Sequence, residues 1–178
     1  MKISFAKPGL PATGIVVVCA TAGSKLSAAA VKLDKKAGGA LTRAIKASRF
    51  EGKKGQSLNV MAPAGTKLDR VMVVGLGKAE DITELEMQKL GGRIYAGTRQ
   101  AKKGTVAIAV DAVKDAKMSA GDIAAEVAYG TQLRSYKFDK YKTKQKPADK
   151  ASLKTVTLHC AGFANARQQL FEARPTAV

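Results

Sequence analysis

A run of aliphatic residues between turn formers, at positions 69–78, constrains the fold of this chain more than any other stretch. Residues 71–74 are apolar and mostly β-branched, and Gly75 and Gly77 follow them on either side of one leucine. The run is too short for a buried helix, so it predicts a strand that is buried on both faces. The glycines predict a tight turn at its end.

A helix is expected almost directly after this turn, over residues 83–102. Thr83 and Glu86 have the spacing of a capping box, in which each side chain satisfies a backbone N–H of the other residue. Glycines at 91, 92 and 97 lie inside the expected helix and indicate close packing against a neighbour. Strand, glycine turn and helix together form the repeating unit of an α/β sheet.

The two glycines also permit a phosphate-binding interpretation. Dinucleotide-binding turns use glycines so that backbone N–H groups approach the phosphate at a helix N-terminus. Here Glu80 occupies the position of the third glycine, and the pair Glu80 and Asp81 would repel an anion. We therefore favour a tight turn out of a central strand over a nucleotide site.

The rest of the chain alternates aliphatic runs with amphipathic stretches, which predicts an α/β fold with one mixed sheet flanked by helices. The short link between the third and fourth strands predicts that these two are antiparallel neighbours. Strands are expected at 2–6, 14–19, 57–62, 70–76, 105–110 and 154–159, and helices at 27–37, 40–47, 83–102, 119–133 and 163–173. We expect a single domain over 1–160, with 161–178 as the start of a further helix.

Charge and cysteine content restrict the classes of protein. The 178 residues include 31 basic and 14 acidic side chains, a net charge of +17 that attracts polyanions and keeps a protein in solution. No apolar run is long enough for a membrane span. Residues 1–7 have no apolar core, so we expect no signal peptide and a cytoplasmic location. Cys19 and Cys160 end apolar runs and are interpreted as buried free thiols, although the sequence does not exclude a disulfide.

Residues for catalysis or metal binding are scarce. His159 is the only histidine, and it lies on an alternating strand where a structural role is favoured. The aspartates at 34, 69, 81 and 122 suit helix caps and turns better than an acid–base pair. Cys19 has no cation beside it that would activate a thiolate. We therefore expect no catalytic residue and no metal ligand in this chain.

A basic and aromatic segment at 129–146 is the candidate for nucleic-acid contact. Aromatic residues at 136, 138 and 141 alternate with lysines, as on surfaces that stack bases and bind phosphates. The alternative, which we favour, is that the aromatics anchor the segment to the core while the lysines remain solvated. The candidate contact residues are Lys53, Lys54, Arg134, Lys137, Lys140, Lys142, Lys144 and Lys146.

Four segments, taken together, resemble the N-terminal domain of the leucyl aminopeptidases, the M17 cytosol aminopeptidase family. The most specific is the helix end at 125–135 followed by Tyr136, Phe138, Asp139, Tyr141 and Lys142. The other three, in sequence order, are 39–41, 50–55 and 73–78. The resemblance extends over nearly the whole chain.

The resemblance implies a mixed-sheet α/β domain similar to macro domains, followed along the chain by a two-metal peptidase domain. In the family, the metal-binding and catalytic residues lie in that second domain, whose signature Asn-Thr-Asp-Ala-Glu-Gly-Arg does not occur here. No catalytic or metal-binding residue is therefore carried over. The implied parent is a hexameric leucyl aminopeptidase with two divalent metals, manganese or zinc, and this chain would be its inactive N-terminal part.

Two other functions compete with this interpretation. One is a nucleic-acid-binding module that uses the basic surface. The other is a macro-type ADP-ribose binder, which rests on fold analogy alone and would need an apolar pocket beside a glycine-rich phosphate loop. For the aminopeptidase interpretation we expect partners in the peptidase domain and in copies of the chain, weak non-specific DNA binding, and no membrane.

Overall fold

Seven strands form one mixed sheet in the computed structural model, which describes residues 1–136 and 151–172. The strands are β1 (Lys2–Ala6), β2 (Thr13–Thr21), β3 (Lys25–Leu26), β4 (Ser57–Met61), β5 (Lys67–Gly77), β6 (Thr105–Val110) and β7 (Thr155–Cys160). Their order is β1-β7-β6-β2-β5-β4, and β3 pairs with β2 off this path. Neighbours from β1 to β5 are parallel, whereas β4 is antiparallel to β5, as predicted from the short link between them.

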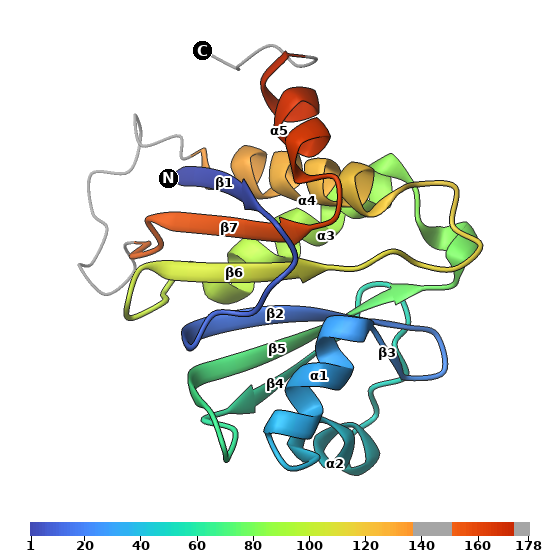
Figure 1. The fold of residues 1–178 in the computed structure, drawn as a ribbon, viewed down its shortest axis with the longest axis vertical. Coiled ribbons are helices and arrows are strands. Elements are labelled where there is room, and N and C mark those ends of the chain that lie inside the picture. The colour runs from blue at the N-terminus through green and yellow to red at the C-terminus, as the bar shows by residue number, and fades with distance from the viewer. Residues whose placement is uncertain (137–150, 173–178) are drawn as a thin grey trace, which may run out of the picture.

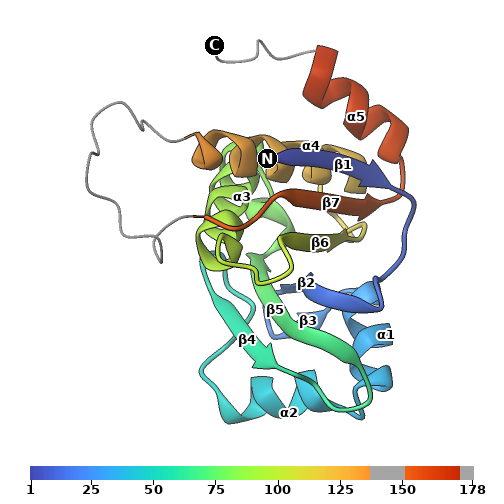
Figure 2. The same cartoon turned by 90° about the vertical axis from the view of Figure 1, so that its left-hand side faces the viewer.

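Helices cover both faces of the sheet (Figure 1). The helices α1 (Ala28–Lys36) and α2 (Ala40–Ala47) pack on one face, and α3 (Glu84–Thr98), α4 (Ala120–Ser135) and α5 (Phe163–Glu172) lie on the other. Figure 2 shows the same layers after a quarter turn. No helix among the described residues is long and apolar enough to cross a membrane.

The middle strands are buried because both of their faces are covered. In β2, Val17 packs with α3 and α4, and its neighbours Val16 and Val18 pack with α1 and α2; all three are fully buried. In β5, Val71 and Val73 have no exposed surface either. The expected two-sided burial of the central run is thus confirmed, and the core is aliphatic.

The helices α3 and α4 approach so closely that their backbones touch. A Cβ atom on Gly91 would clash with the carbonyl oxygen of Val127, and one on Gly130 would clash with that of Gln88. The prediction of close packing from glycines in a helix is confirmed at Gly91. At Gly92 it is wrong, because an added Cβ would have no neighbour nearer than 3.8 Å.

Several boundaries differ from those expected. The helix predicted over 83–102 ends at Thr98, because the carbonyl of Arg99 accepts hydrogen bonds from the backbone of Ser152 and Leu153, a contact between distant segments. The strand predicted at 70–76 begins at Lys67 and runs to Gly77. The two-residue strand β3 had no signal in the sequence, since it forms only by pairing with the end of β2.

The two cysteines are free and buried. They lie on β2 and β7, with β6 between those strands. Two strand spacings amount to roughly 9–10 Å, which exceeds the reach of a disulfide between Cα atoms. The open question from the sequence is therefore resolved in favour of two separate thiols.

Candidate functional site

The parallel strands β2, β5 and β6 end at the same edge of the sheet, here called the carboxyl edge. The chain leaves β2 toward α1 on one face and leaves the adjacent β6 toward α4 on the opposite face (Figure 1). Where neighbouring strands of an α/β sheet send their chains to opposite faces, a crevice opens between the two connections, and ligands bind there in many such proteins. The topology thus places the candidate site at the carboxyl edge.

A cleft of about 590 Å³ occupies this position. It is lined by the ends of β2 and β5 and by the segments that follow the three strands: residues 19–22 at the end of β2, 25–28 in β3 and the start of α1, 76–79 at the end of β5, and 111–115 after β6. Its volume lies within the range of small-molecule sites in proteins. The cleft is therefore a property of the whole sheet rather than of any single motif.

The glycine turn at the end of β5 forms one side of the cleft, but its backbone is already engaged. The N–H of Gly75 donates to Gln56 O and that of Gly77 to Gly52 O, both at 2.9 Å. A Cβ on Gly75 would clash with the carbonyl of Lys53. Gly77 has a φ of 79°, which favours glycine. Both glycines thus serve the packing of the 50–56 loop, but Gly75 lies inside β5 and pairs with Ala20, so only Gly77, the last residue of β5, stands at the predicted turn.

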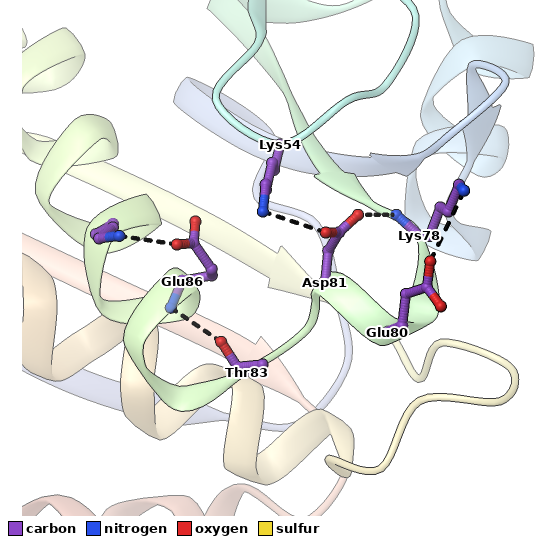
Figure 3. A network of polar contacts seen from close by, with 7 residues as sticks. Lys54, Lys78, Glu80, Asp81, Thr83 and Glu86 are labelled. Carbon is purple, nitrogen blue, oxygen red and sulfur yellow. Dashed lines mark hydrogen bonds and ion pairs between the residues drawn. The ribbon is translucent and has the colours of Figure 1, made fainter.

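A network of charged side chains follows this turn (Figure 3). The Asp81 carboxylate accepts a hydrogen bond from the Lys78 backbone N–H at 2.9 Å and lies 3.3 Å from Lys54 Nζ. The Lys78 backbone and then Lys54 hold the pKa of Asp81 below its ordinary value. Lys78 Nζ also lies 3.7 Å from the Glu80 carboxylate. Asp81 and Glu80 thus form ion pairs with Lys54 and Lys78, and these lysines are already engaged by carboxylates of the protein.

The capping box predicted at the start of α3 is only half formed. Thr83 Oγ1 accepts a hydrogen bond from the Glu86 N–H at 3.4 Å, as expected. The Glu86 carboxylate instead binds Lys89 at 2.8 Å, which lowers the pKa of Glu86. The Thr83 N–H donates to the Asp81 carbonyl, so it does not need the Glu86 side chain. The local pattern was correct for the threonine and wrong for the glutamate.

Asp111 is the functional candidate that the sequence alone did not reveal. It directly follows β6, is partly buried, and accepts a hydrogen bond from the Ala29 N–H at 2.8 Å through Oδ2. Ser27 caps the same helix by accepting from the Ala30 N–H at 3.3 Å. An aspartate directly after a buried parallel strand was the available signal, since such positions meet at the carboxyl edge.

The two thiols near this edge are buried, and burial disfavours their thiolate forms. Burial, and secondarily the Asp111 carboxylate, raises the pKa of Cys19 to about 12. Burial raises the pKa of Cys160 to about 11. A thiol with so high a pKa is protonated at neutral pH and does not attack a carbonyl. The interpretation of both cysteines as buried structural residues is confirmed.

Only three of the eight predicted nucleic-acid contacts lie within the described residues. Lys53 and Lys54 belong to a loop at the carboxyl edge and pair with Glu51 and Asp81. Arg134 lies in the last turn of α4, which starts after β6 and runs toward the opposite edge of the sheet. The structure therefore separates Arg134 from the two lysines. The other candidates, Lys137, Lys140, Lys142, Lys144 and Lys146, lie outside the described residues.

The described aromatics of this segment behave differently from one another. Tyr129 packs against the core, as the anchoring interpretation requires. Tyr136 is 48% exposed and contacts Gln132, so it does not anchor the segment. Phe138 and Tyr141 lie outside the described residues.

The remaining histidine and carboxylates have structural partners. His159 Nδ1 lies 3.0 Å from the Lys7 carbonyl oxygen. Asp34 accepts hydrogen bonds from the backbone of Leu41 and Thr42 and so caps α2, while Asp122 forms a capping box with Ser119. Within residues 1–136 and 151–172, no group of three or more histidine, cysteine, aspartate or glutamate side chains is placed to hold a metal ion.

Comparison with solved structures identifies the architecture. The chain matches a mutant of tomato leucine aminopeptidase with a TM-score of 0.69 and 19% identity, over 96% of this chain and 35% of that one. It also matches a mutant of a macrodomain from Oceanobacillus iheyensis, with a TM-score of 0.64 and 12% identity, over 96% of this chain and 90% of that one. The expected macro-like α/β fold is confirmed.

Sequence comparison is more specific. The family model described as "Cytosol aminopeptidase family, N-terminal domain" matches residues 16–145. Proteins named "Probable cytosol aminopeptidase" from Rhodopseudomonas palustris and Afipia carboxidovorans are each 37% identical, over 94% of this chain and 33% of theirs. The chain thus spans about a third of the length of these curated relatives. The resemblance is confirmed, and the chain belongs to the cytosol aminopeptidase family, whose N-terminal domain it represents.

Proposed function

We propose that this chain is the non-catalytic N-terminal domain of a metal-dependent leucyl aminopeptidase, where it supports oligomer contacts and the shape of the substrate entrance. One observation carries the proposal: 94% of this chain aligns with a relative named as a probable cytosol aminopeptidase, and the aligned part makes up about a third of that relative's length. The parent protein would remove N-terminal residues from peptides in the cytoplasm. Its peptidase domain and further copies of the chain would be the partners.

The donor set of the described residues does not fit a dinuclear metal centre. Asp34, in the last turn of α1, binds the start of α2, while Asp81, Asp111 and Asp122 lie in separate turns or helix starts; each of the four accepts a backbone hydrogen bond. We therefore assign no step of peptide hydrolysis to this chain. The two divalent metals of the proposed parent, manganese or zinc, would activate water and stabilise the oxyanion in the remaining two thirds of the protein. We expect the 178-residue chain alone not to hydrolyse leucine amide with either metal added.

Exposed apolar surface near β1 supports a role in protein contacts. A groove of about 520 Å³ lies beside β1. It is lined by Met1, by residues 2–5 of β1, by Gln132 of α4 and by Arg167 of α5. Met1 and Phe163 are 46% and 42% exposed. β1 is also an edge strand, whose outer backbone groups are open to pairing. These features suit a surface that another domain or subunit covers.

A domain exchange with the Rhodopseudomonas palustris relative tests the proposal. This chain would replace the matching third of the relative, and a second protein would lack that third altogether. Hydrolysis of leucine nitroanilide with manganese or zinc and the mass by light scattering would be measured for both and for the intact relative. We expect the chimera to approach the intact relative in mass and activity. A chimera that equals the deletion protein in both would contradict the proposal.

A nucleic-acid-binding module remains the second candidate, because the net charge of +17 favours contact with polyanions. The separation of Arg134 from Lys53 and Lys54 gives no single described surface for such contact. We therefore rank it below the aminopeptidase domain, and a salt series given in the Discussion tests it.

A further inference from the structure

The cleft at the carboxyl edge carries unpaired charges of both signs. Lys25 and Lys114 line it, are exposed, and make no ion pair with the described residues. Asp111 lines it as well, and only its Oδ2 accepts a hydrogen bond from the protein within the described part of the chain. The second carboxylate oxygen is therefore available to a donor from a ligand.

An anion alone does not suit this cleft. The N–H groups of Ala29 and Ala30 at the start of α1 are bound by Asp111 and Ser27, and the N–H groups of Gly75 and Gly77 are bound by backbone carbonyls. Backbone N–H groups at a helix start or in a glycine-rich segment are the donors that typically bind a phosphate. The carboxylate of Asp111 lies at the same helix start and would repel it. These four backbone N–H groups thus already donate to acceptors of the protein itself.

The walls between the charges are apolar and small. Leu26 and Val113 are partly buried and Leu76 is buried, while Ala20, Ala28 and Ala112 leave room beside them. The volume of about 590 Å³ is larger than a single amino acid requires and suits a molecule of dipeptide size. An aliphatic side chain placed there would lose water-exposed apolar surface.

We propose that this cleft binds a short peptide as a zwitterion, with the ammonium group at Asp111 and the carboxylate at Lys25 or Lys114. The charge-assisted hydrogen bond to a partly buried carboxylate fixes one end, and the lysines attract the other. Binding does not depend on the proposed function; only the match between this ligand class and the substrates of an aminopeptidase rests on it.

Calorimetric titration of the 178-residue chain with four probes tests the ligand class. The probes are leucyl-alanine, N-acetyl-leucyl-alanine, leucyl-alanine amide and AMP. Leucyl-alanine should bind saturably, and removal of its ammonium charge by acetylation should weaken binding by about tenfold or more. The amide should bind less strongly than the free dipeptide by a smaller factor, because the lysines are exposed. Equal binding of the acetylated peptide, preference for AMP, or no saturable binding would each overturn the proposal.

Variants locate the site. Asp111→Asn keeps an oxygen acceptor for the Ala29 N–H but removes the charge, so it should weaken leucyl-alanine binding by about tenfold or more. Asp69→Asn is the matched control, since Asp69 lies outside the cleft and pairs with Lys103. Lys25→Gln with Lys114→Gln tests the other end without touching a helix cap, and Lys102→Gln is its control. Unchanged affinity in both cleft variants would overturn the assignment. A failure here leaves the domain exchange unaffected, so the two proposals fail separately.

Discussion

The helices of the two layers are held by different contacts. The helices α3 and α4 touch through backbone, where Gly91 and Gly130 leave no space for a side chain. The helices α1 and α2 depend on carboxylates: Asp111 binds the start of α1, and Asp34 binds the start of α2. The contact between α3 and α4 is therefore sensitive to added volume, and the start of α2 to the loss of an acceptor. This difference predicts how each layer responds to substitution.

The largest effect is expected from Gly130→Ala. Its Cβ would clash with the backbone of Gln88, which cannot move without separating the two helices. We expect the free energy of unfolding to fall by about 2 kcal/mol or more. Gly92→Ala is the control: the position is helical and open, so it should gain about 0.5–1 kcal/mol in stability. Urea denaturation measures both, and equal losses would show that packing is not the cause.

In the other layer, Asp34→Ala should be costly without any clash. The variant leaves the N–H groups of Leu41 and Thr42 without their acceptor, and loss of such a cap typically costs about 1–2 kcal/mol. Asp69→Ala removes an exposed carboxylate that pairs with Lys103 at 3.5 Å, and should cost no more than about 0.5 kcal/mol. A loss for Asp69→Ala as large as that for Asp34→Ala would contradict the role of the cap.

A smaller effect, visible only in acid, is expected from Asp81 in the turn that precedes α3. The Lys78 backbone N–H and Lys54 lower the pKa of this carboxyl in the folded state. The stabilisation is therefore present above the unfolded pKa, near about pH 4, and is lost as the pH falls through the lower folded pKa. Asp81→Asn should flatten the fall of the urea midpoint between about pH 4 and 2. Glu80→Gln, 78% exposed at its side chain, is the control and should leave the slope unchanged.

The smallest effect is expected for the binding of DNA by the basic residues. We expect weak DNA binding that is indifferent to sequence, because lysines are flexible point charges that neutralise phosphates without reading bases. Affinity should fall steeply between about 50 and 200 mM salt, and replacement of Lys140, Lys142 and Lys144 by alanine should flatten that slope. Replacement of Lys53 and Lys54, at the carboxyl edge, should have less effect because both already pair with carboxylates. Fluorescence anisotropy with two unrelated duplexes measures this, and tight sequence-selective binding at physiological salt would contradict it.

The sequence predicted most of the architecture because burial leaves a clear pattern. Residues 71–74 are apolar at successive positions, and a short run of this kind is typical of a strand that is covered on both faces. A helical layer on each side of the sheet follows from that prediction. The features that the hydrophobic pattern could not predict depend on contacts between distant segments. β3 exists only as a partner of β2, and α3 ends where Ser152 and Leu153 bind the Arg99 carbonyl.

The candidate site was less predictable than the fold. The negative conclusions about His159, the thiols and the scattered aspartates needed only residue types and spacing, and the structure gives Cys19, Asp34 and His159 local partners. The cleft needed the strand order, since it forms where β2 and β6 lie side by side although 83 residues separate the end of β2 from the start of β6. The role of Asp111 could not be seen before Ala29 was placed beside it.

The pairing of β1 with β7 has a consequence for synthesis. Ser4 and Thr157 contact each other across 153 positions, and within residues 1–136 and 151–172 β1 pairs with β7 alone. During translation β1 therefore stays unpaired until β7 has been synthesised, near the end of the domain. At roughly 5–20 residues per second this takes on the order of ten seconds or more. Throughout that interval the nascent chain presents β1 as an unpaired strand that chaperones can bind.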